Sequence, residues 1–134
     1  MTRVLLDTSA YSAFLRGHED IHRNLQEADE IHLNAIVLGE LRAGFQHGAR
    51  RRDNEKELHA FLASPRVTVA DITPETALRY AEIVNSLRRS GSPIPTNDIW
   101  IAATAMQHGL ELVTTDNHFR KVPQIIVHCW PVAG

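Results

Sequence analysis

The sequence predicts an α/β protein, a three-layer α/β/α sandwich with a mostly parallel central sheet. Short apolar segments typical of strands alternate with amphipathic helical segments along the chain. Strands separated by helices favour parallel pairing, because each helix supplies the crossover to the next strand. The length of 134 residues fits one folded unit. We therefore expect a single domain over residues 1–134.

The first half of the chain predicts two strands, each followed by helices. "RVLL" (3–6) and "EIHLN" (30–34) are short and mostly apolar, as is typical of strands covered on both faces. The segment "SAYSAFLRG" predicts a helix that ends at Gly17, because glycine suits the last turn of a helix. Apolar residues at helical spacing mark the other helices of this half: one on Ile21, Leu25 and Ala28, one over 35–47, and one on Leu58, Phe61 and Leu62.

The second half continues the alternation. "RVTVADI" (66–72) is rich in β-branched residues and predicts a strand. Thr73-Pro74 starts the next helix, since proline suits the first helical position, and Gly91 ends it. After the loop "SPIPT", the alanine-rich run "NDIWIAATA" predicts a helix that ends at Gly109. The last two expected strands are "ELVTT" (111–115) and "QIIVHCW" (124–130).

The composition is that of a globular protein, with 43% apolar and 22% charged residues. The N-terminal segment has too short an apolar stretch for a signal peptide, and no run approaches the length of a membrane span. The one cysteine, Cys129, excludes an internal disulfide. We expect a cytoplasmic protein with no membrane partner.

The positive charge is carried almost entirely by arginine, although the net charge is only −2. The arginines include the triplet Arg50, Arg51 and Arg52 and the pair Arg88-Arg89. Arginine makes planar, bidentate contacts with phosphate, so the triplet is a candidate RNA-binding segment. Solvated helix faces and interface ion pairs explain the same residues equally well.

Four acidic residues occupy informative positions in the expected fold. Asp7 directly follows the first strand, and Asp116 directly follows "ELVTT". Asp98 lies at the head of a helix, and Glu40 lies on an otherwise apolar helix face. Ligands of open parallel sheets bind beyond the carboxyl ends of the strands. These four side chains are therefore expected to converge on one edge of the sheet.

Each acid also has an ordinary structural explanation, and the sequence leaves both open. An aspartate at a helix start complements the helix dipole and accepts backbone N–H bonds. The structural roles are a helix cap for Asp7, a helix start for Asp98, an Asx turn with Asn117 for Asp116, and an ion pair with Arg42 or Arg50 for Glu40.

The segments that carry these acids resemble the acidic motifs of PIN domains, specifically the VapC-type toxins of bacterial toxin–antitoxin pairs. The segments are "VLLDTSAY", "VLGELRAG", "NDIWIAATA" and "GLELVTTDNHF". The resemblance runs from about residue 3 to residue 128 in the expected order. It implies a Mg²⁺- or Mn²⁺-dependent ribonuclease whose catalytic and metal-binding residues are Asp7, Glu40, Asp98 and Asp116. Small polar residues are expected to support the acids: Thr8, Ser9, Asn97 and Thr115.

The resemblance also implies partners, namely an RNA substrate, a small antitoxin protein, and a homodimer or larger toxin–antitoxin assembly. We expect the antitoxin on the helices around Ala10–Leu15 and Ala35–Phe45. An acid-lined groove flanked by apolar helix faces suits an amphipathic helix that ends in arginine. Tyr11, Phe14 and Phe45 would otherwise be core residues, and at least one of them is expected to be.

The chemistry of the acids is consistent with that resemblance. Several carboxylates a few ångströms apart cannot all stay ionised without a cation. Oxygen ligands without a cysteine or a histidine pair favour Mg²⁺ or Mn²⁺ over zinc. Such an ion activates water and polarises a phosphoryl oxygen, which favours hydrolysis of a phosphodiester. We expect Asp7 and Asp98 to be the primary ligands, with Glu40 completing the site and Asp116 binding a second or transient ion.

Other classes of protein fit less well. A phosphatase with an aspartyl nucleophile would have a second aspartate at the position of Ser9, and the chain has no glycine-rich phosphate loop. His18 and His22 lack a third zinc ligand nearby. The remaining alternative is an inactive module of the same fold that binds RNA or regulates without cutting it.

Overall fold

A five-stranded parallel sheet forms the centre of the computed structural model, which describes residues 1–132. The last two residues of the predicted domain, 133–134, lie outside the described residues. The strand order is β3-β2-β1-β4-β5, and every pair of neighbours is parallel. The strands are β1 (Arg3–Leu6), β2 (Glu30–Asn34), β3 (Val67–Ala70), β4 (Glu111–Thr114) and β5 (Val127–Cys129).

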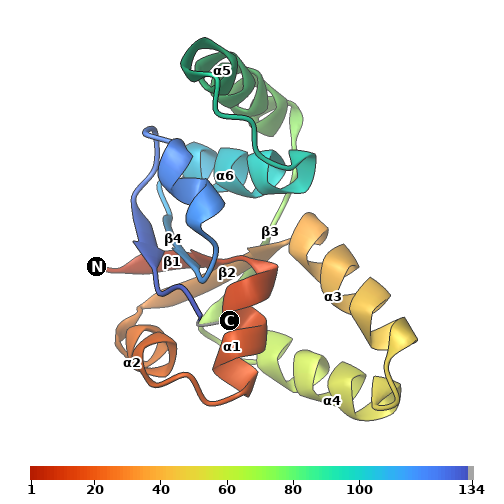
Figure 1. The fold of residues 1–134 in the computed structure, drawn as a ribbon. Helices are drawn as coiled ribbons and strands as arrows, with labels where there is room; N and C mark the ends of the chain where they lie inside the picture. The colour runs from red at the N-terminus through yellow and green to blue at the C-terminus, as the bar shows by residue number, and fades with distance from the viewer. Residues whose placement is uncertain (133–134) are drawn as a thin grey trace.

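Helices cover both faces of this sheet, which confirms the predicted three-layer α/β/α arrangement (Figure 1). One layer holds α6 with α5 packed outside it, and α1 and α2 lie on the opposite face. Helices α3 and α4 pack on each other and extend to one side of the sheet. The helices are α1 (Thr8–Leu15), α2 (Glu19–Glu27), α3 (Ala35–His47), α4 (Arg51–Leu62), α5 (Pro74–Ser90), α6 (Thr96–His108) and the 3₁₀ helix η1 (Asn117–Lys121).

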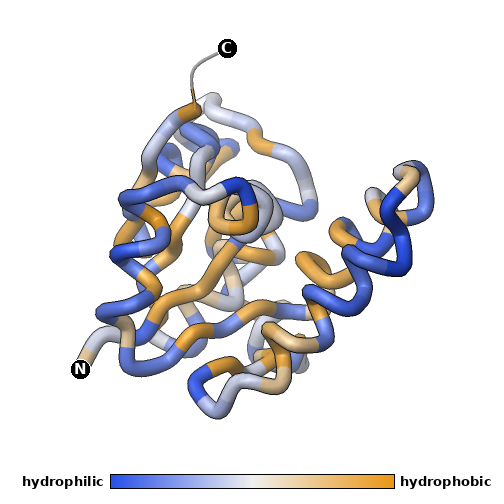
Figure 2. The backbone as a smooth tube through the Cα atoms, turned by 90° about the horizontal axis from the view of Figure 1, so that it is seen from below, coloured by the Kyte–Doolittle hydropathy of each residue, from blue (hydrophilic) through white to orange (hydrophobic). Residues whose placement is uncertain are grey.

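The core lies between the sheet and its two helical layers. Hydrophobic residues run through the middle of the molecule, and the α3–α4 pair projects away from them (Figure 2). The three apolar residues of β1, Val4, Leu5 and Leu6, are fully buried, as expected for a strand with helices on both faces. Helix α6 presents Ala102 and Ala103 among its buried residues. These small side chains let α6 lie close to the sheet, which positions its first turn at the sheet edge.

Two predicted strands are shorter in the structure because they are edge strands. The segment 66–72 forms a strand only over Val67–Ala70, and 124–130 only over Val127–Cys129. An edge strand has a partner on one side only, so its ladder stops where that partner stops. The last pairs are Asn34 with Ala70 and Thr114 with Cys129.

The predicted helix ends are largely confirmed. Helix α5 begins with a capping box between Thr73 and Thr76, has proline in its first turn, and ends at Gly91 in the left-handed conformation. Gly109 ends α6 with a φ of 63°. Helix α4, marked in the sequence by Leu58, Phe61 and Leu62, already begins at Arg51, within the arginine triplet. Over the part of the chain that the structure describes, no helix has the length and hydropathy needed to cross a membrane.

Candidate active site

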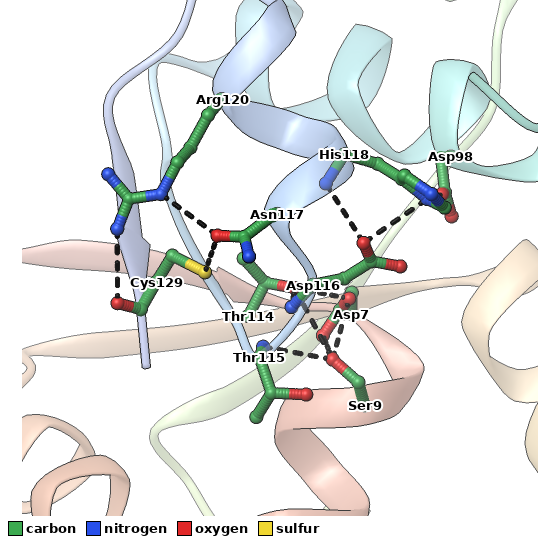
Figure 3. Close-up of polar contacts among 10 residues, drawn as sticks. All are labelled: Asp7, Ser9, Asp98, Thr114, Thr115, Asp116, Asn117, His118, Arg120 and Cys129. Carbon is green, nitrogen blue, oxygen red and sulfur yellow. Dashed lines mark hydrogen bonds and ion pairs between the residues drawn. The ribbon is translucent and has the colours of Figure 1, made fainter. Parts of the chain in front are cut away.

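The candidate site lies at the carboxyl edge of the sheet, where β1 and β4 end side by side. Leu6 pairs with Val113 in the parallel ladder, and the Asp7 backbone N–H donates to the Val113 carbonyl at 3.3 Å. The residues at the ends of both strands, Asp7 after β1 and Thr114–Asp116 at the end of β4, are therefore neighbours although more than 100 positions separate them. Figure 3 shows these side chains together with Asp98 of α6 and His118 of η1.

Asp7 is buried and strongly hydrogen-bonded. Its carboxylate accepts the backbone N–H of Ala10 at 2.8 Å, which caps α1, and the hydroxyl of Thr114 at 2.7 Å. The Ser9 hydroxyl lies 2.8 and 2.9 Å from the two carboxylate oxygens. The residue is only 4% exposed. The predicted capping role is therefore correct, but a cap does not require burial of the whole carboxylate.

The pKa of Asp7 is raised to about 6, mainly by burial, and the negative charge of Asp98 contributes in the same direction. The hydrogen bonds from Thr114, Ala10 and Ser9 act in the opposite direction, because they stabilise the ionised form. The balance shows that the Asp7 carboxylate is held at a place where its charge is costly. A cation beside it would offset that cost.

Asp98 does not cap its helix. The N-cap of α6 is Pro95, which supplies no side-chain cap bond, and Asp98 lies in the first turn with its side chain 15% exposed. Asp98 Oδ2 lies 3.2 Å from Nδ1 of His118. Burial raises the pKa of Asp98, and the charges of Asp116 and Glu40 raise it further, while His118 lowers it. The charges of Asp7, Glu40 and Asp116 are thus each close enough to interact with the charge of Asp98.

Glu40 of α3 points toward the same edge. Its Oε1 accepts the hydroxyl of Thr8 at 2.5 Å, and its Oε2 accepts the side-chain amide of Asn97 at 3.2 Å. The predicted alternative, an ion pair with Arg42 or Arg50, is wrong. Both arginines pair with acids of α4 instead, Arg42 with Glu55 and Arg50 with Asp53 and Glu57.

Asp116 forms the predicted Asx turn and also meets a residue that the sequence analysis missed. Its Oδ1 accepts the backbone N–H of His118 at 2.9 Å, and the imidazole Nδ1 of His118 lies 3.1 Å from the same oxygen. The Asp116 backbone N–H donates to Thr114 Oγ1 at 2.9 Å. The sequence signal for His118 was its place two positions after the acid in "TTDNHF", but only the structure shows that the turn brings its ring back to Asp116.

Three of the expected supporting residues contact the acids directly. Thr8 and Asn97 donate to Glu40, and Ser9 donates to Asp7. Thr115 contributes only its backbone N–H, which donates to Ser9 Oγ at 3.0 Å. The side-chain role expected for Thr115 belongs to Thr114, which is fully buried at the end of β4. A polar residue that ends a buried strand beside the acids was the signal for it.

The donor set fits a divalent cation. Within residues 1–132, one group of three metal-ligating side chains comes together, namely Asp98, Asp116 and His118. One ligand atom of each lies within 4.8 Å of the others. Glu40 and Asp7 raise the negative charge around it. Oxygen-rich sites of this type bind hard divalent ions.

The arginine triplet is not brought to the acids. Arg51 and Arg52 begin α4, and the start of α4 lies at the outer end of the α3–α4 pair (Figure 1). All three side chains are exposed, and Arg50 pairs with Asp53 at 3.8 Å and with Glu57 at 3.6 Å.

The fold and the acidic edge define a PIN domain. The chain matches the family described as PIN domain over residues 4–125, and it belongs to that family.

Relatives of the chain are VapC-type proteins. Ribonuclease VapC2 of Rickettsia felis is 28% identical and covers 94% of this chain and 96% of its own length. Ribonuclease VapC2 of Haemophilus influenzae is 31% identical, with 94% of each chain covered. In the structure of VapBC2 from Rickettsia felis bound to a promoter DNA fragment, one chain is 27% identical with a TM-score of 0.82, covering 95% of this chain and 98% of that one. DNA-bound VapBC from Salmonella typhimurium gives 26% identity and a TM-score of 0.84, with 97% and 99% covered.

Proposed function

We propose that the protein is a VapC-type toxin, an endoribonuclease that hydrolyses RNA phosphodiester bonds with the help of Mg²⁺ or Mn²⁺. The observation that carries this proposal is the mutual approach of acids from β1, α3, α6 and the turn after β4 at one sheet edge. Relatives that align over almost the whole chain are named ribonucleases. Hydrolysis of a phosphodiester is the reaction that an acidic, oxygen-rich metal site serves best.

In this proposal each acid has its own task. Asp7 and Asp98 hold the cation, and a bound cation polarises a phosphoryl oxygen and activates water. Glu40 completes the site and orients the attacking water, since Thr8 and Asn97 fix both of its oxygens. Asp116, next to His118, binds a second or transient ion. Ser9 and Thr114 hold Asp7 in one orientation, and Thr115 anchors Ser9 through its backbone.

The proposed partner is a small antitoxin, as in the VapBC complexes to which the chain is similar. A groove of about 310 Å³ between α1, α3 and α4 is lined by Tyr11, Leu15, Leu41 and Phe45. The groove touches both predicted helices, but none of the four acids lines it, and its lining also includes polar residues, namely Ser12, Arg16, Arg50, Asn54 and Glu57. Tyr11 is fully buried and belongs to the core, whereas Leu15 is exposed and available to a partner. We also propose a homodimer or a larger toxin–antitoxin assembly.

Cleavage of structured RNA by the purified, antitoxin-free protein tests the proposed activity. We expect cleavage in Mn²⁺ or Mg²⁺, none in EDTA, and none with Asp7→Asn under any of these conditions. The matched control is Asp71→Asn, which neutralises an exposed aspartate just after β3 and should leave cleavage unchanged. RNA that is bound but never cut by the folded wild type would favour the inactive binding module.

A further inference from the structure

We propose that Nδ1 of His118 is a ligand of the cation held by Asp98 and Asp116, and that this nitrogen shifts the site from Mg²⁺ toward Mn²⁺. The inference rests on the proposed function, because it takes the acids as metal ligands, and it places Asp116 on the same ion as Asp98 rather than on a second ion. It adds a residue outside the acidic set and a choice of metal that the carboxylates alone do not make.

The position of the ring carries the proposal. Nδ1 of His118 lies 3.2 Å from Asp98 Oδ2 and 3.1 Å from Asp116 Oδ1 (Figure 3). Adjacent ligands of an octahedral ion with bonds of about 2.1 Å are separated by about 3 Å. His118 Nδ1 therefore has the spacing of a neighbouring ligand to each carboxylate oxygen, and ligand atoms of the three residues lie within 4.8 Å of one another.

The turn around His118 keeps the ring in this place. The backbone N–H of His118 donates to Asp116 Oδ1 at 2.9 Å, so the same aspartate fixes both the turn and the ring. The side chain of His118 is 45% exposed, and within the described residues Nε2 has no hydrogen-bond partner. The proton of neutral imidazole can therefore reside on Nε2, facing solvent, which leaves the Nδ1 lone pair directed at the acids.

The chemistry of the donor explains the preference. Mg²⁺ favours oxygen ligands and keeps much of its water shell. Imidazole nitrogen suits transition-metal ions, and Mn²⁺, although it is the weakest binder among the first-row divalent ions, accepts this nitrogen more readily than Mg²⁺ does. A site with two carboxylates and one imidazole is thus less suited to Mg²⁺ than one made of carboxylates alone.

Pulsed electron paramagnetic resonance of bound Mn²⁺ tests the inference without any substrate. The full chain, free of a polyhistidine tag, is loaded with one equivalent of Mn²⁺ and measured for modulation by ¹⁴N. We expect nitrogen modulation in the wild type and in His59→Gln, which removes an exposed histidine of α4. We expect none in His118→Gln. Calorimetric titration of the same proteins should show that His118→Gln weakens Mn²⁺ binding by about tenfold or more and Mg²⁺ binding much less.

Three results would overturn the inference, and they differ in what else they affect. Mn²⁺ bound to the wild type without ¹⁴N modulation would mean that His118 only hydrogen-bonds to the carboxylates, while the proposed function would stand. Equal losses of Mn²⁺ and Mg²⁺ affinity in His118→Gln would remove the preference. Failure of the folded wild type to bind either ion would remove the proposed metal site together with this inference. The wild-type spectrum decides the main point even if a variant folds poorly.

Discussion

At the scale of single residues, the acids of this site combine a structural and a chemical task. Asp7 caps α1 through Ala10, and Asp116 closes the turn that begins η1. Both roles use one face of the carboxylate and leave other lone pairs free. Asp98 makes no cap bond, but it lies in the first turn of α6, where its charge complements the helix dipole, and its side chain is held against His118. A structural explanation of an acid therefore does not argue against a functional one.

The raised pKa of Asp7 predicts a pH-dependent stability of the metal-free protein. Asp7 titrates near 3.8 in the unfolded chain and at about 6 in the folded one, so the folded state binds more protons between these values. Its contribution is favourable below pH 4 and is lost as pH rises through 6. The full difference is about 3 kcal/mol. Denaturant unfolding in EDTA at pH 4.5 and 7.5 should show this loss in the wild type and much less of it in Asp7→Asn. Parallel pH profiles for the two proteins would contradict the assignment.

The crowding of the acids predicts an unusual response to Asp98→Asn. The substitution removes a partly buried charge that the charges of Asp116 and Glu40 repel, and no cap bond is lost. Relief of this repulsion should exceed the few tenths of a kcal/mol that loss of a first-turn charge costs. The metal-free variant should therefore be as stable as the wild type, or more stable by about 1 kcal/mol. It should also lose most of the stabilisation that Mn²⁺ gives the wild type, since that gain depends on affinity.

Melting curves with EDTA and with Mn²⁺ measure both effects. The control is Asp53→Asn, which neutralises an exposed aspartate in the first turn of α4. That variant should lose a few tenths of a kcal/mol and keep the full response to Mn²⁺. An Asp98→Asn variant that is destabilised and still gains the full stabilisation from Mn²⁺ would contradict a role of Asp98 in the metal site.

At the scale of elements, the α3–α4 pair separates two tasks. The first turns of α3 lie near the sheet and carry Glu40 to the other acids. The arginine triplet lies at the opposite end of the α3–α4 pair, where α4 begins. Arg50 also lines the groove between α1, α3 and α4 and pairs with Glu57, which lines the same groove. The triplet is therefore divided between a groove residue and two residues at the start of α4.

The salt dependence of RNA binding decides whether the triplet contacts phosphates. If it does, changing Arg50, Arg51 and Arg52 to glutamine should lower the slope of log affinity against log salt by about two to three. The matched control changes three arginines of α5, Arg79, Arg88 and Arg89, to glutamine and alters the net charge equally. Equal slopes for the wild type and the triplet variant would assign the triplet to the protein interface instead.

At the scale of the whole molecule, the fold brings acids from distant segments to one edge of the sheet and forms a groove between α1, α3 and α4 that is the proposed partner site. Both features belong to the toxin proposal. Expression of the chain alone should therefore arrest bacterial growth, because RNA would be cut without restraint. Asp7→Asn should accumulate to the same level without arrest. Equal toxicity of the two proteins, measured as growth after induction with matched expression, would remove catalysis as the cause.

The sequence by itself determined the alternation of strands and helices, the parallel sheet and the positions of the four acids along the chain. These follow from local patterns: apolar runs in β1 and β4, the proline start of α5, and the glycines that end α5 and α6. Local propensity and binary patterning act over a few residues, so they can be recognised in the sequence.

Only the tertiary structure decided which side chains meet. Thr114 reaches Asp7 because β4 lies beside β1 in register. Glu40 does not pair with an arginine, because Thr8 and Asn97 from other elements hydrogen-bond to it. The ring of His118 reaches Asp98 because η1 turns back toward α6. The ends of β3 and β5 were likewise set by the neighbouring strands. Each of these contacts joins segments far apart in the sequence, and their geometry depends on packing that no local pattern encodes.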